Sequence, residues 1–121
     1  MIRRLHVGPR LSEASIAHGL VHLAGQVPEN HPDGDIATQT REVLGHVERL
    51  LAECGSDKSR LLSVQIFLAD IADIAAMNAV WDAWVVPGAT PPRATVQARL
   101  ADPRWRIEVV ATALQAGEQA R

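Results

Sequence analysis

Apolar side chains recur at intervals of three and four positions in two segments of the chain. Over residues 36–54 they fall on one face of a helix, and charged residues lie largely between them. Asp35 is placed to cap the start of this helix, and Gly55 to close its end in a left-handed turn. The same spacing predicts a second helix over residues 73–86, which begins with an acidic capping residue and stops at Pro87-Gly88.

Shorter runs rich in branched residues predict strands. The order along the chain is three strands, helix, strand, helix and two strands. A strand-helix-strand unit favours a parallel pair joined by a right-handed crossover, whereas the opening strands can pair as antiparallel hairpins. We therefore expect an α+β fold with one mixed sheet and both helices on a single face. The predicted strands are residues 2–7, 15–17, 20–25, 61–69, 93–100 and 105–114.

The other face of such a sheet has no helix to cover it. Val64, Ile66, Leu68 and Val109 suggest apolar material on both faces of the sheet. An uncovered apolar face is a common interface, so we expect the protein not to be a monomer.

Size and composition narrow the classes of function. A chain of 121 residues with 47% hydrophobic residues fits one domain over residues 1–121, with a polar tail at 115–121. A net charge of −2 gives no field to hold a polyanion, so nucleic acid is not an expected partner. Cys54 is the single cysteine, and no apolar run approaches the ~20 residues that cross a bilayer. We expect a cytoplasmic protein without membrane contact.

Candidate chemistry gathers near the end of the chain. Arg93 follows the stiff pair Pro91-Pro92, and a fixed guanidinium can bind a carboxylate through two parallel hydrogen bonds. Glu108 lies in the next strand-like run, where a half-buried carboxylate can position or deprotonate a water. The alternatives are an ordinary surface or interface ion pair for Arg93 and an outward-facing strand position for Glu108.

These two residues would not meet easily within one chain. If their strands were antiparallel neighbours, Glu108 would pair nearer Gln97, about 13 Å from Arg93. A neighbouring subunit that completes the site would remove this difficulty.

Five strings in order along the chain resemble the RidA (YjgF) family of small enamine and imine deaminases, especially its YoaB-like branch. The resemblance implies a chorismate-mutase-like fold and a homotrimer with sites in the clefts between subunits. It also implies that Arg93 clamps the substrate carboxylate, that Glu108 orients the attacking water, and that Asn78 lies near the substrate. The strings are Gly25-Gln26-Val27-Pro28, Gly55 to Ser59, Val64 to Asp70, Ala76 to Val85, and Pro92-Arg93 to Glu108.

The chain departs from the best-known members of this family at three positions. Ala24 stands in place of a serine and Thr95 in place of a cysteine, and Arg10 and Leu11 follow the Gly-Pro pair where those enzymes have a tyrosine. Thr95 keeps a hydroxyl and is expected to line the substrate site. Ala24 and Leu11 have lost polar groups, which puts substrate range and turnover in question.

The leading hypothesis is cofactor-free hydrolysis of a reactive 2-imino acid to a 2-oxo acid and ammonia. The rival is a non-catalytic member of the family that senses small carboxylates in the same cleft. No metal site is expected, because His18 and His22 on an extended chain would lie about 13 Å apart. Cys54 near a helix C-terminus is interpreted as a packing residue, since the dipole there disfavours a thiolate. Trp81 and Trp84 share one helical face and are interpreted mainly as core residues, with either able to wall the cleft.

Overall fold

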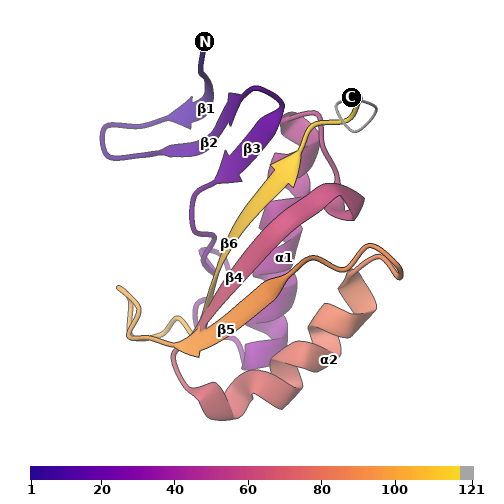
Figure 1. The fold of residues 1–121 in the computed structure, drawn as a ribbon. Coiled ribbons are helices and arrows are strands. Elements are labelled where there is room, and N and C mark those ends of the chain that lie inside the picture. Colours follow the sequence, from indigo (N-terminus) through magenta and orange to yellow (C-terminus); the bar gives the residue numbers. More distant parts are fainter. Residues whose placement is uncertain (118–121) are drawn as a thin grey trace.

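The computed structural model describes residues 1–117 and contains one six-stranded sheet with the order β1-β2-β3-β6-β4-β5 (Figure 1). The pairs β1–β2, β2–β3, β3–β6 and β4–β6 are antiparallel, and β4–β5 is parallel. The sheet is therefore mixed. The strands are β1 Arg3–Val7, β2 Ser12–Ala17, β3 Leu20–Leu23, β4 Leu61–Leu68, β5 Arg93–Gln97 and β6 Ile107–Leu114.

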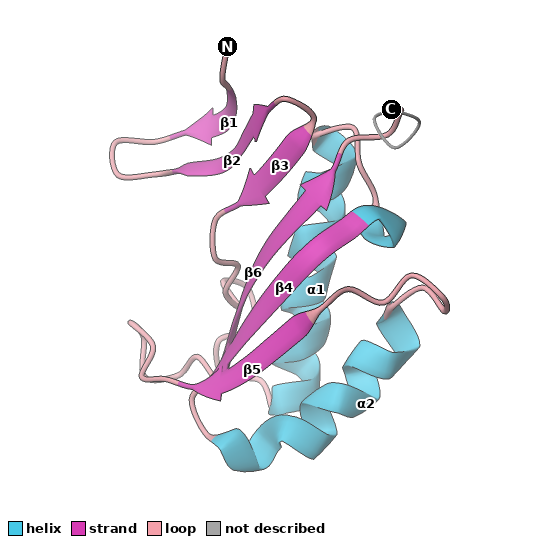
Figure 2. Ribbon diagram, in the orientation of Figure 1, coloured by secondary structure: helices cyan, strands magenta, loops and turns pink. Residues whose placement is uncertain are grey.

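Two α-helices pack on one side of this sheet (Figure 2). They are α1, Ile36–Glu53, and α2, Ile74–Trp84; the short 3-10 helices η1, Lys58–Arg60, and η2, Ile71–Asp73, precede β4 and α2. The α+β prediction, with one mixed sheet and two helices on one face, is confirmed.

The alternation along β6 shows how the two faces of the sheet differ. Ile107, Val109, Ala111 and Ala113 are buried and belong to the core. The residues between them, from Glu108 onward, point to the opposite face and are half-buried. Because side chains alternate across a strand, Glu108 lies on the face that the helices leave open.

The last two strands are not neighbours, which corrects one geometric expectation. β6 pairs with β3 and β4, so β4 lies between β6 and β5. The separation of Arg93 and Glu108 that was expected from adjacent β5 and β6 strands therefore does not apply. The crossover from β4 through α2 to β5 does give the expected parallel pair.

Both predicted ends of the first helix are confirmed. Asp35 accepts a hydrogen bond from the backbone N–H of Thr38 at 2.8 Å, and Gly55 has a φ of 77°. The acidic capping residue predicted for the second helix is wrong. Asp73 makes no side-chain capping bond, and its carboxylate instead lies 3.3 Å from the Nε of Arg106.

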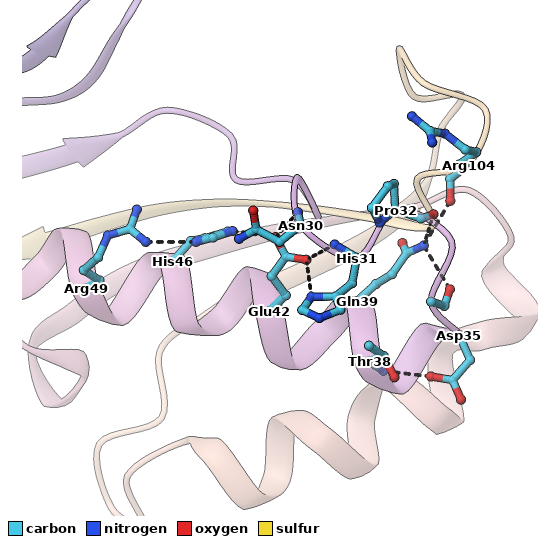
Figure 3. A network of polar contacts seen from close by, with 11 residues as sticks. Asn30, His31, Pro32, Asp35, Thr38, Gln39, Glu42, His46, Arg49 and Arg104 are labelled. Atoms are coloured by element: carbon cyan, nitrogen blue, oxygen red, sulfur yellow. Dashed lines mark hydrogen bonds and ion pairs between the residues drawn. The ribbon is translucent and has the colours of Figure 1, made fainter.

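The buried side chain of Gln39 on α1 forms hydrogen bonds with the loop before α1 and with the segment that precedes β6. The side-chain nitrogen of Gln39 donates to the carbonyls of Pro32, Gly34 and Arg104 at 2.9–3.1 Å (Figure 3). Its oxygen accepts from the backbone N–H of Arg106 at 2.7 Å. Since Arg106 immediately precedes β6, Gln39 fixes the start of the strand that carries the candidate carboxylate.

A second polar cluster on α1 holds the loop before it. Glu42, whose side chain is 7% exposed, accepts hydrogen bonds from the backbone N–H groups of Asn30 and His31. The Nε2 of His46 lies 2.7 Å from the same carboxylate, and Arg49 donates to the Nδ1 of His46 (Figure 3). Burial alone would raise the pKa of Glu42, but these bonds outweigh it and hold the pKa below 4.5.

The structure also bears on the expectations for Cys54, for the polar tail and for membrane-spanning helices. Cys54 is buried, and burial raises the pKa of its thiol, in line with a packing role. Of the predicted polar tail, Gln115 and Ala116 are held by backbone bonds to Gly19 and Gly55, and residues 118–121 lie outside the described residues. No helix within residues 1–117 is long and apolar enough to cross a bilayer.

Candidate functional site

Arg93 begins β5 at the edge of the sheet. The carbonyl of Pro92 accepts a hydrogen bond from Val64 on β4, so the residue before Arg93 is already anchored. Arg93 pairs with the buried Val64, which places its side chain on the helix-facing side of the sheet. There the guanidinium carbon lies 5.1 Å from the ring centroid of Trp81 on α2.

No acidic residue within 1–117 pairs with Arg93, and no hydrogen bond of its guanidinium is found in that part of the chain. The alternative of a surface arginine locked in an ion pair is therefore not what these residues show. A guanidinium held only through its flat face keeps its N–H groups for a ligand.

Thr95 and Asn78 lie on the same side of the sheet as Arg93. Thr95 pairs with the buried Ile66, two residues along β5 from Arg93. Asn78 is in the middle of α2, one turn before Trp81. Because α2 runs antiparallel to β5 in the crossover, Thr95 lies toward the level of Asn78.

Both residues carry a polar atom without a partner. The Oγ1 of Thr95 and the Oδ1 of Asn78 are buried, and neither has a hydrogen-bond partner among residues 1–117. Buried polar atoms are usually paired, and an exception calls for an explanation such as a ligand or a water. Arg93, Thr95 and Asn78, here called the Arg93 set, thus all lie on the helix side of the sheet, and Thr95 and Asn78 each carry a buried polar atom without a partner among residues 1–117.

Glu108 is not part of that set. It pairs with Phe67 on β4 and points to the open face, opposite to Arg93. Its carboxylate lies against the backbone of Gly25, where an added Cβ would come within 2.0 Å of Oε2. The bonds between Gln26 and Val109, at 2.8 and 3.0 Å, hold the Gly25 segment beside β6.

Within one chain, Arg93 and Glu108 lie on opposite faces of the sheet and on strands with β4 between them. Arg93 is in register with Val64 and, through it, with Ala111, which is three residues from Glu108. Two strand spacings and three residues of rise give a separation of roughly 14 Å between their α-carbons. One subunit alone therefore does not assemble Arg93 and Glu108 into a site.

The open face is hollowed beside the start of β5. A depression of about 530 Å³ is lined by polar side chains, by Val110 and by the backbone around Arg93. Its volume falls in the range of small-molecule sites. The lining residues are Ser63, Val64, Gln65, Pro92, Arg93, Ala94, Val110 and Thr112.

Leu11 and Ala24, the two departures from the family pattern that lose polar groups, are not among the residues that line this depression. Leu11 is 56% exposed in the loop between β1 and β2, and Ala24 follows β3, where its N–H donates to the carbonyl of Glu13. His18 has a φ of 53° and forms the β2–β3 turn with Gly19, so the extended geometry assumed for it is wrong. No group of three or more metal-ligating side chains occurs among residues 1–117.

Sequence reasoning did not connect two residues with the candidate pair. Trp81 is a core residue, as its helical spacing predicted, and it is also the described contact of the Arg93 guanidinium, which that spacing alone does not show. Gly25 makes room for Glu108, and no local pattern announces this because the two lie far apart in the chain. The double proline before an arginine, by contrast, was a usable local signal.

The fold is a mixed sheet with two helices on one face. It carries an arginine on the edge strand and a carboxylate on the open face, and comparisons with known proteins assign this arrangement to a family. A family model described as Endoribonuclease L-PSP matches residues 1–115. A RutC family protein of Haemophilus influenzae is 50% identical over 109 residues, which cover 90% of this chain and 94% of the relative. The RutC family protein YoaB of Escherichia coli is 44% identical over 108 residues, which cover 89% of this chain and 93% of that protein.

A solved structure supports the same assignment. A YjgF family member from Neisseria meningitidis has a TM-score of 0.92 and 52% identity, and the match covers 95% of each chain. The chain therefore belongs to the YjgF (RutC, L-PSP) family, and the resemblance found in the sequence is confirmed.

Proposed function

We propose that this protein hydrolyses reactive 2-imino acids, and the enamines in equilibrium with them, to 2-oxo acids and ammonia. Arg93 binds the substrate carboxylate through paired N–H groups. Glu108 takes a proton from a bound water as the water oxygen attacks the imine carbon, so that the C=N bond becomes a C–N single bond on a tetrahedral carbon. The proton passes to the nitrogen, the C–N bond breaks to release ammonia, and the hydroxyl loses its proton as the C=O bond forms. The reaction consumes only water, so the proposal includes no cofactor.

The observation that carries this proposal is the state of Arg93. Its guanidinium is oriented by Trp81 and has no acidic partner among residues 1–117, and its side chain is on the same face of β5 as that of Thr95. A structural arginine would be expected to pair with a carboxylate, whereas a carboxylate-binding arginine needs its donors free.

The proposal requires more than one copy of the chain. Arg93 and Glu108 are on opposite faces of one subunit, and the open face that carries Glu108 has no helix over it. In a homotrimer, Arg93 of one subunit and Glu108 of its neighbour would line one cleft. The site would then form only on assembly.

The proposed ligands are small 2-imino acids, as substrates, and the 2-oxo acids formed from them, in the cytoplasm, where pyridoxal-phosphate enzymes release such imines. The family description names an RNA-cleaving activity. A net charge of −2 disfavours a polyanionic substrate, so we do not extend that activity to this chain.

The test is the decay of a 2-imino acid generated in the assay. We expect Arg93→Ala to abolish the acceleration while the oligomer remains intact. Arg99→Ala, which removes an exposed arginine just beyond β5, is the matched control and should keep full activity. Equal imine decay rates with the wild-type protein and with Arg93→Ala would refute the proposed enzymatic activity.

A non-catalytic carboxylate sensor is the second candidate. The polar groups lost at Ala24 and Leu11, and the separation of Glu108 from Arg93, favour it, because binding needs only the Arg93 set. Calorimetry with 2-oxobutanoate beside the imine assay separates the two functions, since binding without turnover supports the sensor.

A further inference from the structure

Arg93 and Trp81 form a stacked pair between β5 and α2. The guanidinium carbon is 5.1 Å from the indole centroid, and Trp81 is 6% exposed, so the ring is fixed in the core. A cation over an indole face is attracted by the negative charge of the ring surface. The indole is therefore a rigid support for a side chain that otherwise has many rotamers.

A second tryptophan, Trp84, packs against Trp81 and makes no described cation–π contact with Arg93. The ring centroids of Trp81 and Trp84 are 5.6 Å apart and the rings are tilted by 44°. Trp84 is held by its own contacts, because its Nε1 donates to Glu48 at 2.9 Å and the Nζ of Lys58 lies 5.3 Å from its ring. The two tryptophans are thus similar in type and place, but one of them supports Arg93.

We infer that Trp81 is the positioning residue for the carboxylate-binding arginine. This inference rests on the proposed function of Arg93. An acidic partner would occupy the in-plane N–H groups and compete with a substrate carboxylate. The face of an indole fixes the plane of the guanidinium and leaves those donors unoccupied, so the paired geometry exists before the ligand arrives.

The expected size of the effect follows from the strength of such contacts. Loss of a cation–π contact at a partly buried site weakens binding about three- to thirty-fold. Trp81→Leu should therefore raise the Kd for 2-oxobutanoate about tenfold. Trp81→Phe keeps a smaller ring and should raise the Kd about two- to threefold.

Trp84→Leu is the matched control. It removes the same type of side chain one turn away and should also lower the thermal unfolding midpoint, but by less than Trp81→Leu, because Trp84 is only half-buried. It should leave the Kd for 2-oxobutanoate unchanged. If both leucine variants weaken binding equally, Trp81 acts through the stability of the helix and the inference is wrong.

A second measurement is independent of binding and of folding in the variants. The NMR signal of the Arg93 Nε–H group in the wild-type protein should be shifted upfield by the ring current of Trp81. An unshifted signal overturns the inference whatever the binding result. The signal could also be shifted in a protein that neither binds 2-oxobutanoate nor hydrolyses imines. That result would refute the proposed function, while the stacking of Trp81 on Arg93 would still be shown.

Discussion

The carboxylate of Glu108 lies directly against the α-carbon of Gly25. A Cβ at position 25 would come within 2.0 Å of Oε2 and 2.9 Å of the carboxyl carbon. Gly25 has no positive φ, so an alanine fits the backbone there. The glycine is needed for the space that it leaves to the carboxylate, since the backbone conformation itself does not require it.

Gly25→Ala should therefore displace Glu108 without unfolding the protein. The clashing atoms belong to the end of a flexible side chain, which can rotate away. We expect imine hydrolysis to fall by about 10²-fold or more, because a positioned base contributes on that scale. The measurement is the imine decay rate together with the thermal unfolding midpoint.

Gly45→Ala is the control for this substitution. Gly45 is inside α1, and a Cβ there meets nothing within 4 Å. Alanine should stabilise the helix by about 0.5–1 kcal/mol and leave activity unchanged. Full activity in Gly25→Ala would contradict the placement of Glu108 in the site.

Glu108→Gln separates water activation from substrate binding. Glutamine keeps the shape of the side chain but cannot accept a proton from water, so the hydrolysis rate should fall by ~10²- to 10⁴-fold. The Kd for 2-oxobutanoate should stay close to that of the wild type, because Arg93 binds the carboxylate. An unchanged rate would show that another group handles the water.

Gln39→Met should be strongly destabilising. It leaves the carbonyls of Pro32, Gly34 and Arg104 and the N–H of Arg106 without their partner. Buried unpaired groups cost about 1–3 kcal/mol each, so we expect a loss of at least ~2–4 kcal/mol in the free energy of unfolding, measured in urea.

The neighbouring Thr40→Val is the matched control for that loss. Thr40 is as buried as Gln39, but within residues 1–117 its hydroxyl bonds only to the carbonyl of Ile36 one turn earlier. We expect a cost of under about 1 kcal/mol. Similar losses in both variants would mean that burial, and not the shared hydrogen bonds, determines the effect.

Glu42 predicts a specific dependence of stability on pH. Its pKa is held below 4.5 in the folded protein, so its charged form stabilises the fold at pH values above 4.5. This contribution is lost as the pH falls through the lowered pKa. The free energy of unfolding should therefore decline below pH 4.5 more steeply in the wild type than in Glu42→Gln.

Comparison with Glu42→Gln shows in which direction the charge of Glu42 changes the free energy of unfolding. Glutamine cannot accept all the bonds from Asn30, His31 and His46, so the variant is less stable at pH 7. The gap between the two proteins should narrow toward pH 3, because the wild-type carboxylate becomes protonated. A gap that stays constant from pH 7 to pH 3 would show that Glu42 does not titrate with a lowered pKa.

The local elements could be predicted from the sequence because their signals lie in consecutive residues. The three- and four-residue spacing gave α1 to within one residue, and Asp35 and Gly55 marked its ends. Branched runs predicted all six strands, although 20–25, 93–100 and 105–114 were too long by two or three residues and 15–17 was too short by three. Pro92 also marked Arg93 as a residue with a fixed backbone.

The amino-acid sequence by itself determined the helices, the strands, the α+β class and the two residue types suited to a carboxylate and a water. Only the tertiary structure decided that β4 separates β5 from β6, that Arg93 and Glu108 face opposite sides, and that Gly25 and Trp81 hold them. Alternation along a strand states which residues share a face. Strand neighbours and the covered face depend on pairing between distant segments, which leaves no trace in any short stretch of sequence.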